Sequence, residues 1–137
     1  ERMSGNKVDL ELLEIKNRLN SIDLPNVDLI VGIAEGGKVP ASLIAWILEI
    51  PLLIIKINYR DDNNKPRYEF PMLLRDIKIP RNVKKILLVD DVGVSGETLK
   101  LAGEHLKNFE ITTMVMKGSG DIVLFPEIST CVNWPWN

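Results

Sequence analysis

The segment that decides the fold is Ile86–Leu99, which reads ILLVDDVGVSGETL. Four apolar residues lead into two adjacent carboxylates, and a turn rich in glycine and serine follows before a stretch with helical spacing. A short apolar run bounded by turn residues is typical of a buried strand. The segment therefore predicts a strand, a tight turn and a helix in direct succession, with Asp90 and Asp91 where the strand ends.

Apolar runs alternate with helical periodicities on both sides of this segment. We expect strands at Val27–Gly32, Leu52–Ile57, Lys84–Asp90, Ile111–Met116 and Asp121–Leu124, and helices at Asp9–Leu19, Val39–Ile50 and Ser95–Asn108. Such alternation predicts an α/β fold of three layers, a mostly parallel sheet with helices on both faces. Ligands bind such sheets at the carboxyl ends of the strands. Trp46 lies within an apolar helical stretch, so we expect it to pack in the core.

The bulk properties fit one ordinary domain spanning residues 1–137. Asn58–Asn82 is polar and without clear periodicity, so we expect a flexible loop there. The net charge of −2 gives no sign of a nucleic-acid surface. Charged residues and a proline interrupt the longest apolar stretch, Pro40–Ile57, which argues against a membrane span. With no signal-peptide pattern and a single cysteine, Cys131, we expect a cytoplasmic protein without nucleic-acid or membrane partners.

The chemistry of Ile86–Leu99 suits a phosphorylated sugar. Carboxylates such as Asp90 and Asp91 accept hydrogen bonds from vicinal hydroxyls and favour positive charge that develops on a sugar ring. The turn Val94–Thr98 presents backbone N–H groups at a helix N-terminus, which is a binding site for anions. Each residue alone has a structural explanation, such as Ser95 capping the helix. Their order together favours binding of a phosphorylated ribose.

Three other families end a strand in a similar way. The string KKILLVDD resembles the opening of a response-regulator receiver domain, but too few residues follow Asp91 to complete one. Gly32–Lys38 (GIAEGGK) matches the P-loop spacing, yet Val39 follows where that motif needs a magnesium-binding hydroxyl. No strand is followed by the G-x-G-x-x-G of a dinucleotide site. A P-loop-like nucleotide hydrolase stays as the lowest-ranked alternative.

The segment VDDVGVSGET is similar to the phosphoribosyl-pyrophosphate (PRPP) motif of type I phosphoribosyltransferases, and the tail VNWPWN resembles the small xanthine–guanine enzymes. The resemblance implies transfer of the 5-phosphoribosyl group of PRPP to a nitrogenous base, a 6-oxopurine or related base, with release of pyrophosphate. It also implies a role in purine salvage, Mg²⁺ as cofactor, PRPP and a nucleobase as small-molecule substrates, and a homodimer or homotetramer.

The resemblance assigns each part of the site to residues of this chain. Asp90 and Asp91 would be the catalytic pair that holds the ribose hydroxyls, with an indirect role toward the metal. The 5′-phosphate would be bound by Val94, Ser95, Gly96, Glu97 and Thr98, the pyrophosphate by Glu35, Gly36, Gly37 and Lys38, and the base by Lys117, Val132 and Trp134.

Three positions depart from the family pattern. Glu35 stands where the pyrophosphate loop commonly carries a basic residue, and a like charge about 4 Å from pyrophosphate costs roughly a few kcal/mol unless Lys38 offsets it. Val94 replaces an aspartate usual in 6-oxopurine enzymes, and Cys131 replaces an aromatic residue that stacks on the base. These departures keep open a second function, a non-catalytic module that senses PRPP or a nucleotide.

Overall fold

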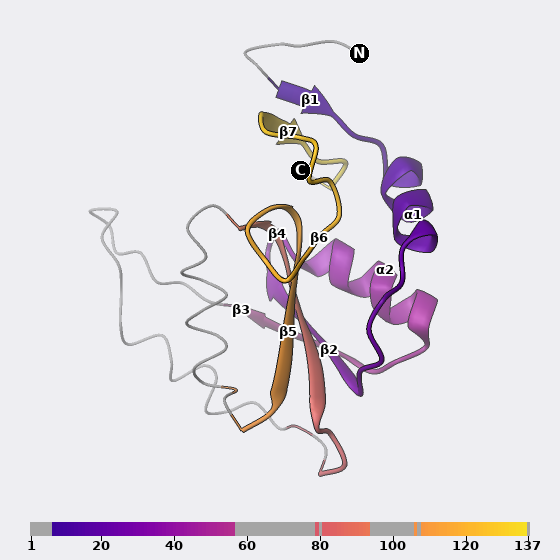
Figure 1. Ribbon diagram of the computed structural model, residues 1–137, viewed down its shortest axis with the longest axis vertical. Coiled ribbons are helices and arrows are strands. Elements are labelled where there is room, and N and C mark those ends of the chain that lie inside the picture. The colour runs from indigo at the N-terminus through magenta and orange to yellow at the C-terminus, as the bar shows by residue number, and fades with distance from the viewer. Residues whose placement is uncertain (1–6, 57–78, 80, 94–105, 107, 137) are drawn as a thin grey trace, which may run out of the picture.

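A parallel five-stranded sheet forms the centre of the protein (Figure 1). The computed structural model describes residues 7–56, 79, 81–93, 106 and 108–136. The sheet has the order β3-β2-β4-β5-β6, with β2 at Leu29–Ala34, β3 at Leu52–Lys56, β4 at Lys85–Gly93, β5 at Glu110–Gly118 and β6 at Ile122–Val123. This confirms the predicted α/β fold with a mostly parallel sheet.

Alternate residues of the strands build two cores on opposite faces of the sheet. Ile30, Leu87 and Met114 point to one face. There they meet helix α1 (Leu12–Ser21) and helix α2 (Lys38–Leu48), which Figure 1 shows on the same side of the sheet. The strand residues adjacent to these in the sequence, such as Val31, Leu88 and Val115, pack on the other face together with Leu106. Apart from Leu106 and Asn108, the helix expected at Ser95–Asn108 lies outside the described residues.

A second sheet, which the sequence did not predict, joins segments from the two ends of the chain. Strand β1 (Lys7–Asp9) pairs in parallel with β7 (Cys131–Asn133). The helix expected from Asp9 therefore begins at Leu12. It starts with a capping box in which the backbone N–H of Glu11 donates to Glu14 Oε1 at 3.0 Å.

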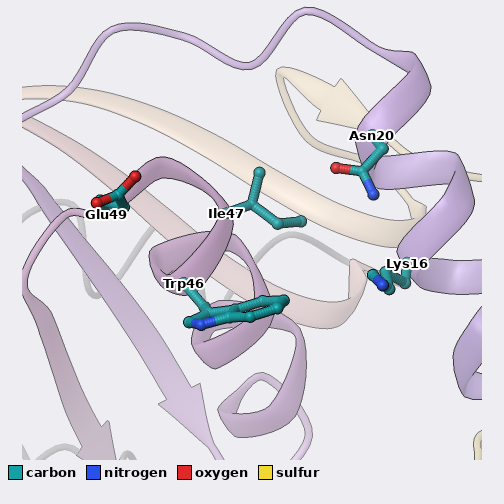
Figure 2. A pocket seen from close by; sticks show the side chains of 5 residues that line it. All are labelled: Lys16, Asn20, Trp46, Ile47 and Glu49. Atoms are coloured by element: carbon teal, nitrogen blue, oxygen red, sulfur yellow. The ribbon is translucent and has the colours of Figure 1, made fainter.

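The expectation that Trp46 packs in the core is wrong. Its side chain is 69% exposed on α2. It borders a hollow between α2 and α1, lined by Lys16, Asn20, Trp46, Ile47 and Glu49 (Figure 2). Because α2 is apolar on nearly every side (KVPASLIAWIL), its hydrophobic pattern does not reveal which residues face the sheet.

Candidate functional site

Most of the described candidate residues lie at the carboxyl edge of the sheet. Glu35 directly follows β2, Asp90 and Asp91 lie near the end of β4, and Lys117 lies near the end of β5. Lys56 ends β3 on the other side of β2. Because these strands are parallel neighbours, their ends place the charged side chains along one edge, where such sheets bind ligands.

The acidic pair is held by the backbone that follows it. The N–H of Asp91 donates to Asp90 Oδ1 at 2.8 Å, and the N–H of Val92 donates to Asp91 Oδ1 at 2.8 Å. Both carboxylates are half-buried within β4, which continues to Gly93 rather than ending at Asp90 as predicted. The strand and a backbone amide together fix the orientation of each carboxylate.

The environment of Asp90 favours its protonated form. Burial, with the neighbouring Asp91 carboxyl, raises the pKa of Asp90 to about 7. Desolvation disfavours a charged carboxylate, and a second negative charge nearby adds to the effect. Asp90 therefore changes charge near neutral pH.

The loop Glu35–Lys38 packs directly against this acidic pair. A Cβ atom at Gly36 would lie 2.3 Å from Asp91 Cγ, and one at Gly37 would lie 2.5 Å from the carbonyl oxygen of Val89. Only glycine permits so close an approach of backbone to side chain and of backbone to backbone. The structure thus brings together two groups of residues that lie more than fifty positions apart in the sequence.

Internal hydrogen bonds shape this loop. A cis peptide bond joins Ala34 to Glu35. The N–H of Gly37 donates to the carbonyl of Ile33 at 2.7 Å, and the N–H of Lys38 donates to the carbonyl of Glu35 at 3.1 Å. The loop then continues into α2, whose N-terminal turn therefore also lies at the carboxyl edge of the sheet.

Lys56 is a charged residue at this edge that no sequence motif marks as part of a site. Its Nζ lies 3.3 Å from Glu35 Oε2, and the two side chains are 66% and 72% exposed. Lys56 is paired in register with Ala34, the residue before Glu35. The available signal was a lone charge at the end of an otherwise apolar strand, LLIIK.

The residues expected at the base lie near the end of β5, in β7 and just after β7. Lys117 is half-buried, and its ammonium donates a hydrogen bond to the carbonyl of Thr130. Trp134 is 5% exposed, and its ring stacks on Trp136 with centroids 5.2 Å apart. Val132, in β7, packs against the same core as Trp134. Trp134 is thus a buried residue, and the ring stacked on it belongs to Trp136, two positions later in the sequence.

Two expected parts of the site fall outside the described residues. These are the turn Val94–Thr98 and nearly all of the loop predicted at Asn58–Asn82. Across the ranges that the structure does describe, no three His, Cys, Asp or Glu side chains gather as a metal site. Mg²⁺ commonly keeps several waters and binds through one or two carboxylates plus substrate phosphates, and the Asp90–Asp91 pair fits that manner of binding. None of the helices in the described part of the chain is long and apolar enough to cross a membrane.

The sequence matches a known protein family over most of its length. Residues 11–117 match the phosphoribosyl transferase domain family. The chain is 26% identical over 113 residues to a xanthine-guanine phosphoribosyltransferase of Idiomarina loihiensis, covering 79% of this chain and 70% of that protein.

Solved structures share the fold at lower sequence identity. The purine phosphoribosyltransferase of Pyrococcus horikoshii is similar with a TM-score of 0.74 and 24% identity, over 96% of this chain and 94% of that one. The Helicobacter pylori xanthine-guanine-hypoxanthine phosphoribosyltransferase is similar with a TM-score of 0.57 and 14% identity, over 90% and 82% of the two chains. Because the family match covers most of the sequence, the chain belongs to the phosphoribosyl transferase domain family.

Proposed function

We propose that this protein transfers the 5-phosphoribosyl group of PRPP to a nitrogenous base, a 6-oxopurine or a related base, and releases pyrophosphate. The observation that carries the proposal is the close approach of Gly36 to Asp91, by which the glycine loop lies beside the acidic pair. In the proposal the loop binds an anion and the two carboxylates bind a sugar. In this proposal the protein is a cytoplasmic enzyme of purine salvage and works as a homodimer or homotetramer.

Asp90 and Asp91 act on the ribose. Their carboxylates accept hydrogen bonds from the 2′ and 3′ hydroxyls and fix the sugar against the end of β4. A base nitrogen attacks C1 as the bond from C1 to the pyrophosphate oxygen breaks, and the proton of that nitrogen passes to solvent. Positive charge develops on the sugar ring in this step, and the fixed carboxylates stabilise it.

Two backbone sites hold the phosphates at either end of PRPP. Val94, Ser95, Gly96, Glu97 and Thr98 bind the 5′-phosphate. Glu35, Gly36, Gly37 and Lys38 bind the pyrophosphate at the N-terminal end of α2, where the helix dipole favours an anion. Mg²⁺, when bound beside Asp90 and Asp91, neutralises part of the pyrophosphate charge.

Lys117, Val132 and Trp134 serve the base. The Lys117 ammonium has three N–H donors, and one of them already goes to the Thr130 carbonyl. The others are available to an exocyclic oxygen of a 6-oxopurine. Val132 and Trp134, which both pack into the core on the α1–α2 face of the sheet, would supply the apolar side of the base site.

The test is release of pyrophosphate from PRPP with hypoxanthine, guanine, xanthine and adenine as acceptors. Asp91→Asn should lower kcat/KM about 100-fold or more, because a fixed charge that stabilises the transition state is lost. Asp23→Asn, at an exposed position after α1, should have no effect. Unchanged kinetics in Asp91→Asn would refute the ribose assignment.

The alternative of a PRPP- or nucleotide-sensing module is favoured by Glu35, whose negative charge opposes pyrophosphate, and by Val94, which stands where 6-oxopurine enzymes usually carry an aspartate. Tight binding of PRPP without turnover on any of the four bases would support that alternative. ATP hydrolysis that Lys38→Ala abolishes would instead support the P-loop-like hydrolase.

A further inference from the structure

The negative charge of Glu35 has a counterpart in the structure, and that counterpart lies within reach of the same ligand. Lys56 Nζ is 3.3 Å from Glu35 Oε2. Strand register fixes this neighbourhood, because Lys56 lies opposite Ala34 on the adjacent parallel strand. Both side chains therefore emerge at the edge of the sheet where Gly36 meets Asp91.

The ion pair between Lys56 and Glu35 is exposed to solvent, so it holds the lysine only weakly. An ion pair between side chains as exposed as these contributes little to stability, because water screens it and long side chains lose freedom in it. A weakly held ammonium can be shared with an incoming anion, since it carries three N–H donors and Glu35 occupies one direction. A diphosphate, with several negative charges, attracts such an ammonium far more strongly than one carboxylate does.

The loop Glu35–Lys38 has no net positive charge of its own for binding a diphosphate. Glu35 and Lys38 cancel each other within the four-residue loop. Lys56 changes the balance at this edge by one positive charge, without any change in the loop sequence. A basic side chain, absent at position 35, is thus present on the neighbouring strand.

We propose that the Lys56 ammonium directly contacts the pyrophosphate group of the substrate, and that Glu35 holds it ready for that contact. The inference rests on the proposed function and adds to it a pyrophosphate-binding residue outside the glycine loop. The ligand class is a diphosphate, either free or as part of PRPP.

Binding of inorganic pyrophosphate, measured by isothermal titration calorimetry with Mg²⁺ present, tests the proposal. Lys56→Gln should weaken binding about tenfold, because one charge contact is lost. This loss should be smaller at high salt, which screens the charges. Lys56→Arg should keep most of the affinity. In steady-state assays Lys56→Gln should raise the KM for PRPP more than it lowers kcat.

A matched control exists at the opposite edge of the sheet. Lys85 begins β4 and pairs with Glu110 at 3.8 Å, in an exposed ion pair of the same kind. Lys85→Gln should leave pyrophosphate affinity unchanged. An equal loss in Lys85→Gln and Lys56→Gln would point to general electrostatics and overturn the proposal.

A double variant separates direct contact from simple neutralisation of Glu35. If Lys56 contacts pyrophosphate, the pair Glu35→Gln with Lys56→Gln still binds more weakly than Glu35→Gln alone. If Lys56 only neutralises Glu35, the two bind equally, and the proposal is wrong. Wild-type protein that binds no pyrophosphate would defeat the proposed function as well, whereas normal binding in Lys56→Gln defeats this inference alone.

Discussion

Asp90 shows how the surroundings of one side chain change its chemistry. Its pKa is raised to about 7 because burial and the nearby Asp91 carboxyl disfavour the charged form. Protons therefore bind this carboxyl more tightly in the folded state than in the unfolded chain. Its contribution to stability is full below a pH of about 4 and is lost as the pH rises through about 7.

Asp90→Asn should accordingly stabilise the protein at alkaline pH. We expect a gain of about 2 kcal/mol at pH 8, shrinking toward pH 5, because the amide carries no charge to desolvate. Urea unfolding at the two pH values measures it. The control is Asp28→Asn, since N–H groups of Lys85 and Lys84 lower the pKa of Asp28 and that variant should lose stability at pH 8. A destabilised Asp90→Asn at pH 8 would contradict the electrostatic account.

Gly36 and Gly37 are neighbours that should respond differently to a methyl group. At Gly36 the methyl would meet the Asp91 carboxylate, which has to turn aside, so Gly36→Ala should lower kcat/KM for PRPP about tenfold or more with modest loss of stability. At Gly37 it would meet the carbonyl oxygens of Val89 and Ile33, which are fixed in strands. Gly37→Ala should therefore cost about 2 kcal/mol or more in the free energy of unfolding.

Kinetics and thermal unfolding of the two alanine variants, measured side by side, check this contrast. A Gly36→Ala enzyme with normal kinetics would show that the loop and the acidic pair do not need their close contact.

The sequence predicts part of this edge because the rule for parallel sheets is general. It indicates that Asp90, Asp91 and the glycine loop follow strands, and strand ends meet at one edge. It does not indicate Lys56, because pairing between Lys56 and Ala34 depends on strand order, and nothing local in the sequence sets that order. The burial behind the raised pKa of Asp90 is likewise a property of the assembled fold.

At the scale of elements, the apolar runs locate the central strands well and the helix faces poorly. Runs such as ILLV in β4 are buried on both sides, so continuous hydrophobicity identifies them. Strands β1 and β7 have three residues each and mixed character, and only their pairing with each other makes them strands. In α2 the uniform apolar pattern hides the exposed side, where Trp46 lies.

Two substitutions on α2 test that assignment of faces. Ile44 is fully buried, and Ile44→Ala should cost about 3 kcal/mol through lost burial and the cavity left behind. Trp46→Ala should change stability by less than about 0.5–1 kcal/mol, because its larger side chain is mostly in solvent. Chemical denaturation measures both variants, and a larger loss at Trp46 would mean that α2 is rotated relative to the sheet.

At the scale of the whole molecule, Arg18 connects parts of the chain that are distant in sequence. From α1 it donates to the carbonyl of Leu124 at 2.8 Å and to Glu127 at 2.7 Å, and its guanidinium lies 4.5 Å from the centre of the Phe125 ring. A planar group that bonds and stacks at once is difficult to replace.

Arg18→Ala should lower stability by about 1–2 kcal/mol, since it leaves the Leu124 carbonyl unpaired and uncovers Phe125. Glu127→Ala removes only the exposed ion pair and should cost about 0.5 kcal/mol or less. Thermal unfolding of the two variants should show this order, and equal losses would mean that the ion pair alone carries the effect.

The parallel pairing of β1 with β7 has a consequence for synthesis of the protein. The partners of Lys7–Asp9 are residues 131–133, so β1 has to wait for a segment that follows it by more than 120 residues. Contacts that span such a sequence distance form late and slow folding. A nascent polypeptide therefore carries β1 without this partner until residues 131–133 have been made, and a truncation before residue 131 would remove the pairing altogether.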